Sequence, residues 1–181
     1  MKKLILAAIA VALGGASYAA SCNWEIKSDW VSADGENPLT AQVYAFDALA
    51  YSLSSVSAAL AKNDNSVLSS ALAAGAVDSE GAFVFSGNGI SDDGATPPYA
   101  KVYTILIAKD AGDNSYFYAS DTKSVKLTDA VMAGQANFAW DEITTGAVGS
   151  SGWSAMAVPE PTSGLLLLFG MAGLALKRKR A

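Results

Sequence analysis

The chain has 181 residues, with 17 acidic side chains, 12 basic side chains, one cysteine and no histidine. The absence of histidine excludes Ser-His-Asp and Cys-His catalytic groups and the usual His-based zinc and iron sites. Because the chain has a single cysteine, an intramolecular disulfide is excluded as well, and the fold has to be held by its core.

The N-terminal residues have the three-part pattern of a secretory signal peptide. Residues 1–3 are basic after the initiator, residues 4–16 form an uncharged apolar run, and small residues follow. The run is too short for a stable membrane-spanning helix. Cleavage after Ala19 places small residues at positions minus one and minus three, so we expect a signal peptide over residues 1–19 and a mature chain that starts at Ala20. A retained N-terminal anchor is the alternative.

Cys22 lies close to the expected start of the mature chain. Lipoprotein signals usually carry a large aliphatic residue three positions before the modified cysteine, and Ala19 stands there. Lipidation of Cys22 is therefore the lesser alternative, and we expect an incidental, partly buried thiol.

The segment between the two ends is strongly acidic. Residues 20–158 contain 16 acidic side chains and six basic ones, all lysine, for a net charge of about −10. Such a surface repels nucleic acid and anionic lipid and suits a soluble or matrix-embedded extracellular protein. Without arginine the segment lacks the bidentate clamps that fix carboxylate or phosphate substrates. We therefore expect no nucleic-acid partner and no cofactor.

Hydrophobic patterning predicts one domain over residues 20–157. A strand is expected at 42–46, followed by two short helices that form a hairpin from Leu49 to Leu72, with Gly75 where the second helix would end. Further strands are expected at 82–85, 100–108, 116–118, 124–127 and 137–143, with a helical turn at 128–134 and a short strand around Trp153. The run 100–108 is hydrophobic on both faces at its centre, which predicts a central strand.

This order of elements favours a mainly β fold, an antiparallel sandwich or roll with a short helical hairpin packed at one edge. Residues 146–152 are rich in glycine and serine, and we expect them to form a flexible spacer that leads to the C-terminal segment.

Two groups of acidic residues could carry chemistry. Asp92 and Asp93, and the loop with Asp110, Asp113 and Asn114, offer oxygen ligands for Ca²⁺, but neither matches the ligand spacing of an EF-hand. We expect solvated turn acids and no metal site.

The adjacent Asp141 and Glu142 could resemble a glycosidase pair. Neighbours on a strand point to opposite faces, so these two cannot flank one bond, and we expect no catalytic residues.

The aromatic side chains allow two interpretations. Exposed rings on a sheet face could stack on sugars, whereas rings in the core would only pack. Core packing is favoured, because aromatic residues dominate β-sandwich cores. The rings concerned are Trp24, Trp30, Trp140, Trp153, Tyr44, Tyr99, Tyr103, Tyr116 and Tyr118.

The last 24 residues, 158–181, form three consecutive parts. Pro159 and Pro161 keep the backbone around Glu160 extended, as a protease cleft requires. Residues 162–176 carry no charge and would span roughly 22 Å as a helix, short of the ~30 Å hydrocarbon core. The basic residues that follow stay on the cytoplasmic side of a membrane and leave the domain outside; they are Lys177, Arg178, Lys179 and Arg180.

This arrangement of Val-Pro-Glu-Pro-Thr-Ser, apolar run and basic end resembles the PEP-CTERM sorting signal. The resemblance covers about 24 of the 181 residues, and an ordinary C-terminal transmembrane anchor is the alternative. It implies recognition of Pro159, Glu160 and Pro161 by an exosortase, an inner-membrane protease or transpeptidase. It also implies transient anchoring in the inner membrane, and delivery to the cell surface or extracellular matrix of a Gram-negative-type bacterium.

The resemblance implies no activity for the domain, because proteins with this signal are otherwise diverse. From its acidity and its lack of histidine and arginine we expect a structural or exopolysaccharide-matrix role. A carbohydrate-binding module displayed at the cell surface is the alternative, and a secreted hydrolase is less favoured.

Overall fold

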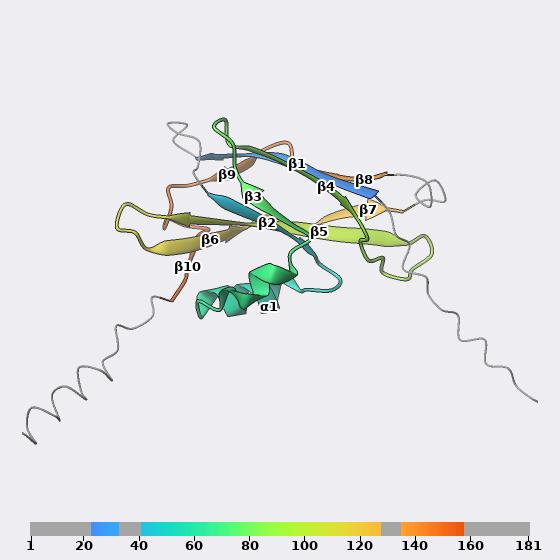
Figure 1. Cartoon of the computed structure of the whole chain (residues 1–181), viewed down its shortest axis with the longest axis horizontal. Coiled ribbons are helices and arrows are strands. Elements are labelled where there is room, and N and C mark those ends of the chain that lie inside the picture. The colour runs from blue at the N-terminus through green and yellow to red at the C-terminus, as the bar shows by residue number, and fades with distance from the viewer. Residues whose placement is uncertain (1–22, 33–40, 128–134, 158–181) are drawn as a thin grey trace, which may run out of the picture.

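Two β-sheets face each other, and two short helices cover the outer side of the larger sheet (Figure 1). This computed structural model describes residues 23–32, 41–127 and 135–157. The elements in chain order are β1 (Asn23–Ser32), β2 (Gln42–Asp47), α1 (Leu53–Ala61), the 3-10 helix η1 (Asn65–Ser70), β3 (Ala73–Ala76), β4 (Ala82–Asn88), β5 (Tyr99–Lys109), β6 (Ser115–Ala119), β7 (Lys123–Lys126), β8 (Gln135–Ala139), β9 (Ile143–Thr145) and β10 (Ser154–Ala155).

The smaller sheet is organised around β1. Strand β4 pairs with β1 antiparallel along one side, with Lys27 opposite Val84. On the other side β8 and β9 follow one another, both parallel to β1, with Trp30 opposite Ile143 in the second pairing. The sandwich is therefore mainly antiparallel, as expected, with parallel pairing of β8 and β9 to β1.

Strand β1 was not among the elements predicted from the sequence. Its burial nevertheless alternates strictly: Trp24, Ile26, Ser28 and Trp30 are buried, and the residues between them are exposed or half-buried. This period of two was the available signal. A search for β-branched residues misses β1, because its outward positions are charged or polar.

The larger sheet has the order β10-β6-β5-β2-β3, and β7 pairs with the free part of β5. The prediction of a central strand over 100–108 is confirmed, because β5 pairs on both sides and is buried on both faces. Val102 and Leu106 point toward the smaller sheet, whereas Tyr103 and Ile105 point toward the helices.

The helical hairpin is only partly as expected. The first helix begins at Leu53, not Leu49, because the Ser52 side chain caps the amide of Ser55. The second is a 3-10 helix that ends at Ser70. The expectation that Gly75 stops a helix is wrong, since Gly75 lies inside strand β3. A Cβ there would come within 2.7 Å of the Phe85 ring, which explains the glycine.

Residues 146–152 are not a free spacer, and that expectation is corrected. Val148 packs against the core between the sheets, and the Trp153 indole donates a hydrogen bond to the carbonyl of Gly146 (3.1 Å). Gly149 has φ of +87°, and a Cβ at this position would meet the Tyr116 ring at 3.1 Å. The segment is therefore a packed connection between β9 and β10.

The expected strand 137–143 is interrupted. It divides into β8 and β9, with Trp140 to Glu142 between them. The Trp140 amide still donates to the Lys27 carbonyl (3.2 Å), which keeps the two short strands on the same side of β1.

Several expectations lie outside the described residues. They are the signal peptide over 1–19 with Ala19 and Ala20, Cys22, the helical turn at 128–134, and the sorting signal over 158–181 with its helix at 162–176. Within the ranges 23–32, 41–127 and 135–157, no helix has the length and apolar character needed to span a membrane.

Candidate functional site

The C-terminal end of the domain is fixed beside α1. Strand β10 pairs with β6, and the Met156 amide donates to the Ser115 carbonyl (3.0 Å). The next amide, that of Ala157, donates to the carbonyl of Ala61 at the end of α1 (3.1 Å). The Met156 side chain is buried in the cluster between the larger sheet and the helices. The chain is therefore held up to Ala157, two positions before Pro159.

All four tryptophans are buried in the structure. All four belong to the core cluster between the sheets. Trp30 meets Tyr118 edge-on, with ring centroids 5.4 Å apart, which joins the two sheets. The interpretation of the tryptophans as core residues is therefore confirmed.

The acidic loops use their carboxylates to close turns. Asp110 accepts hydrogen bonds from the amides of Gly112 (2.8 Å) and Asn114 (2.9 Å), and Asp113 pairs with Lys109 at 2.7 Å. Bonds from the side chain and then the amide of Asn114 hold the Asp110 pKa below its ordinary value. These carboxylates close the turn between β5 and β6, and hydrogen-bond donors of the same hairpin orient them.

In the loop that precedes β5, the carboxylates again accept hydrogen bonds from backbone amides of the loop. Asp93 accepts from the amides of Tyr99 (2.9 Å) and Ala95 (3.2 Å), and its other oxygen lies 3.4 Å from the Lys101 ammonium. The Tyr99 amide is the main reason that the Asp93 pKa is lowered. Asp92 accepts from the Gly94 amide (2.8 Å). Over the described residues, no group of three or more potential metal ligands comes together.

A buried polar pair joins the larger sheet to the entrance of the helical segment. The Tyr103 hydroxyl donates to the carbonyl of Tyr51 (2.9 Å), and Asp47 accepts from the amides of Leu49 and Ser91. Burial, and then the nearby Asp47 charge, raise the pKa of Tyr103 above its ordinary range. Both groups hold backbone in place, which is a structural role.

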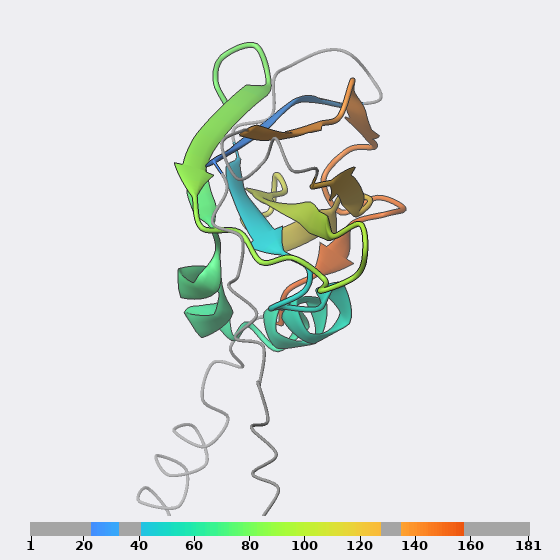
Figure 2. The same ribbon diagram turned by 90° about the vertical axis from the view of Figure 1, so that its right-hand side faces the viewer.

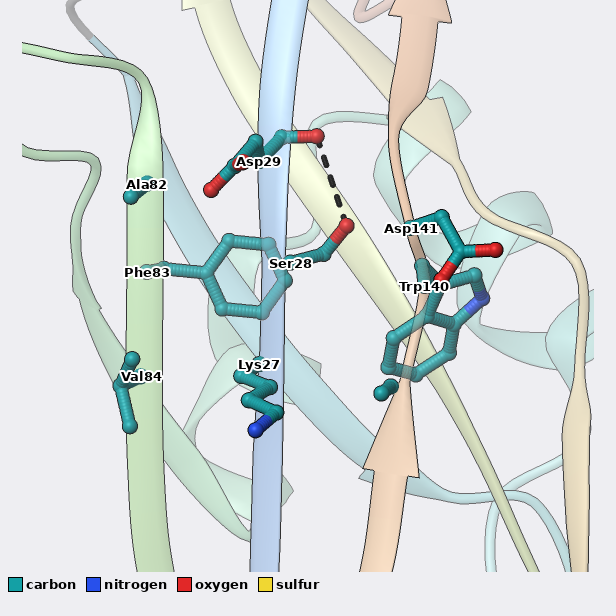
Figure 3. A pocket seen from close by; sticks show the side chains of 9 residues that line it. Lys27, Ser28, Asp29, Ala82, Phe83, Val84, Trp140 and Asp141 are labelled. Carbon is teal, nitrogen blue, oxygen red and sulfur yellow. Dashed lines mark hydrogen bonds between the residues drawn. The ribbon is translucent and has the colours of Figure 1, made fainter.

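The outer face of the smaller sheet is hollowed over β1. Figure 3 shows β4, β1 and the end of β8 side by side, with Lys27 and Asp29 on the middle strand. The short side chains of Ala82 and Ala139 flank β1 and leave an open hollow of about 300 Å³. Val84, 64% exposed, lies on the β4 side.

The chemistry of this hollow is mixed. It offers an ammonium from Lys27, carboxylates from Asp29 and Asp141, the apolar Val84 and part of the otherwise buried Trp140. Such a set can donate and accept hydrogen bonds beside an apolar surface, as a neutral polar ligand requires. Sequence reasoning missed the site because its residues come from three strands far apart in the chain.

Asp141 and Glu142 line two different hollows, and Trp140 lines both of them. Asp141 lines the hollow over β1, whereas Glu142 lines a neighbouring one of about 200 Å³ and accepts a hydrogen bond from Thr144 (2.8 Å). The two residues lie between β8 and β9 instead of on one strand, so the reason expected for their separation is corrected. They line separate hollows.

A larger hollow of about 520 Å³ lies between the ends of β2, β3 and β5. Its lining is mainly alanine and short aliphatic side chains, and its one titratable group is Lys109, which pairs with Asp113. The lining of this hollow brings no pair of titratable groups together.

Comparison with known proteins adds one match. Residues 157–180 match the family described as the PEP-CTERM protein-sorting motif. The match begins at Ala157, the last residue that the structure describes. A search of curated proteins found no match to the chain. The chain therefore carries a PEP-CTERM protein-sorting motif, which supports export to the cell envelope or surface of a Gram-negative bacterium and sorting through recognition by an exosortase.

Proposed function

We propose that the protein is a non-catalytic component of the cell surface or of the exopolysaccharide matrix, released there by cleavage close to Pro159, Glu160 and Pro161. The sorting motif directly after a folded, strongly acidic domain is the observation that carries this proposal. On this proposal the signal peptide ends at Ala19, the helix over 162–176 anchors the precursor in the inner membrane, and the basic tail from Lys177 to Arg180 faces the cytoplasm.

The acidity of the domain supports a matrix role. Residues 20–158 carry a net charge of about −10. A highly charged chain stays soluble at high local concentration and attracts cations. The lack of histidine and arginine in this segment supports the absence of an enzymatic role.

Intact-mass measurement of the protein recovered from the cell surface tests the proposal. The expected mass starts at Ala20 and ends between Ala157 and Thr162. A Glu160→Ala variant should accumulate with its tail in the membrane, and Glu142→Ala, which removes a carboxylate of the domain, is the matched control. Recovery of a surface protein that still contains residues 165–180 would contradict the proposal and favour a plain anchor.

A second candidate function is glycan binding at the hollow over β1. Its supporting observation is the cluster of Lys27, Asp29 and Asp141 around the exposed Val84, on a sheet face that no described element covers. This candidate replaces stacking on an exposed tryptophan, which the burial of all four rings removes.

Binding of the domain 20–157 to polysaccharide purified from the host's matrix tests the second candidate. Asp29→Ala should weaken binding about tenfold if the hollow is used, because one well-placed hydrogen bond to a charged group is worth roughly 1.5 kcal/mol. Lys27→Ala should act in the same direction, with Lys126→Ala, an exposed lysine on β7, as its control. Equal binding by all variants would contradict this use of the hollow.

A further inference from the structure

The point where the chain leaves the domain lies on the helical side. We define the helical layer as residues 48–72, which include α1 and η1. The Ala157 amide is bonded to Ala61 in this layer, and Met156 packs with Val56 and Leu60. Figure 2 shows both helices at one end of the domain, with the smaller sheet at the other. The sorting signal therefore starts at the helical layer.

The connection from this point to the apolar run is short. Only residues 158–161 separate Ala157 from Thr162, and even fully extended the five steps reach ~17 Å. A domain of this size has a radius of gyration of ~14 Å and hence a diameter of ~35–40 Å. The connection is shorter than half the domain, so it cannot reach around to the opposite face.

The helical layer also differs from the rest of the domain in charge. Between Asp47 and Asp78 the only charged residues are Lys62 and Asp64, which cancel. The other described residues carry twelve carboxylates against five lysines. Each charge near an anionic bilayer changes the partitioning by about fivefold, so turning the acidic faces toward anionic lipid is strongly disfavoured.

Exposed apolar side chains are also found in the helical layer. Three large apolar residues are exposed in the described chain, and two of them, Leu49 and Tyr51, belong to the turn that enters α1. This turn reaches the level of α1 in Figure 1. Tyrosine is enriched at membrane interfaces because its ring is apolar and its hydroxyl is polar.

We propose that the helical layer faces the lipid headgroups of the inner membrane while the uncut precursor is anchored, with the smaller sheet and its hollow turned away from the bilayer. This inference rests on the proposed anchoring of the sorting signal. The neutral layer allows an acidic domain to sit on an anionic surface at the distance that the short connection dictates. The exosortase then meets the chain where it leaves the domain, after Ala157 next to α1.

Site-specific fluorescence in vesicles tests the orientation. The uncut chain, purified from membranes of a host without exosortase and carrying Cys22→Ser, is reconstituted in phosphatidylethanolamine and phosphatidylglycerol with a headgroup quencher. A label at Ala58→Cys on α1 should be quenched at least threefold more than one at Ser86→Cys on the outer face of β4. Both positions are exposed in the domain.

A flexible insertion of twelve Gly and Ser residues after Ala157 is the control for the short connection, and it should abolish the difference. Equal quenching at the two positions without the insertion, in chains that resist alkaline extraction, would overturn the orientation and leave the proposed function intact. Chains that alkali extracts would overturn both. Shielding of the Ala58 label only when exosortase is present would assign the face to the enzyme instead of the lipid.

Discussion

The two faces of the larger sheet carry cores of different origin. The core toward the smaller sheet is rich in tryptophan and draws on strands from both ends of the domain, from Trp24 to Trp153. The core toward the helices is smaller, and most of its residues come from the continuous stretch 44–71, closed by Met156. The first core depends on pairing between distant segments, whereas the second is mainly local.

This difference suggests a division of roles. The core between the sheets fixes β1 and β5 against one another and should set the stability of the whole domain. The helical core positions the last residues before the sorting motif. The following predictions test that division.

Leu106→Asp should have the largest effect. The side chain lies wholly buried between the sheets, its burial is worth ~2 kcal/mol, and an unpaired carboxylate in its place adds several kcal/mol more. We expect the variant to lose its cooperative thermal transition by circular dichroism. Val84→Asp, the same kind of change on an exposed strand position, should stay within about 0.5 kcal/mol of the parent. A folded Leu106→Asp domain would contradict the central position of β5.

Trp30→Ala should lower the free energy of unfolding by about 4 kcal/mol, because it leaves a large cavity between two sheets that no nearby side chain can fill. Leu60→Ala in the helical core should cost about 2–3 kcal/mol, because α1 can shift toward the gap. Urea unfolding of the domain 20–157 measures both. A larger loss for Leu60→Ala would reverse the proposed order of the two cores.

Met156→Ala should destabilise the domain by about 2 kcal/mol, because the side chain is buried against Leu60 and Phe117 at the exit of the chain. Hydrogen exchange of the backbone amides of Ser154–Ala157 should speed up more than that of β1, because the contacts of the helical core are mainly local. The control is Ala155→Ser, an exposed position of β10. Uniform loss of protection throughout the domain would mean that the two cores unfold as one.

Tyr103→Phe should have the smallest effect at neutral pH, about 1 kcal/mol, from loss of its hydrogen bond to Tyr51. The raised pKa of Tyr103 adds a pH dependence. An unfolded tyrosine ionises near pH ~10, whereas the buried one stays neutral. The stability that Tyr103 contributes is thus complete below that pH and is lost as the pH rises further.

Stability of parent and Tyr103→Phe, measured from neutral pH to above pH ~10, tests this linkage. The parent should lose more stability than the variant over the alkaline range. Parallel curves for the two proteins would show that Tyr103 ionises as freely in the fold as outside it.

The targeting signal and the strands with a clear local pattern could be predicted from the sequence. The sorting motif over 157–180 is a linear signal made of consecutive residues, so finding it requires no tertiary contact. Strand β5 and its hairpin with β6 were predictable because their partners are adjacent in sequence and β5 is hydrophobic on both faces.

Tertiary structure alone decided how the distant parts combine. Strand β1 meets β8 and β9 more than a hundred residues later, and nothing in the local sequence of either segment specifies this parallel pairing. The pairing with β8 places Ala139 opposite Lys27 and so contributes to the hollow over β1. Packing of Trp153 and Met156 likewise turned an expected Gly and Ser spacer into part of the domain, because burial of those two side chains depends on neighbours that the local sequence does not contain.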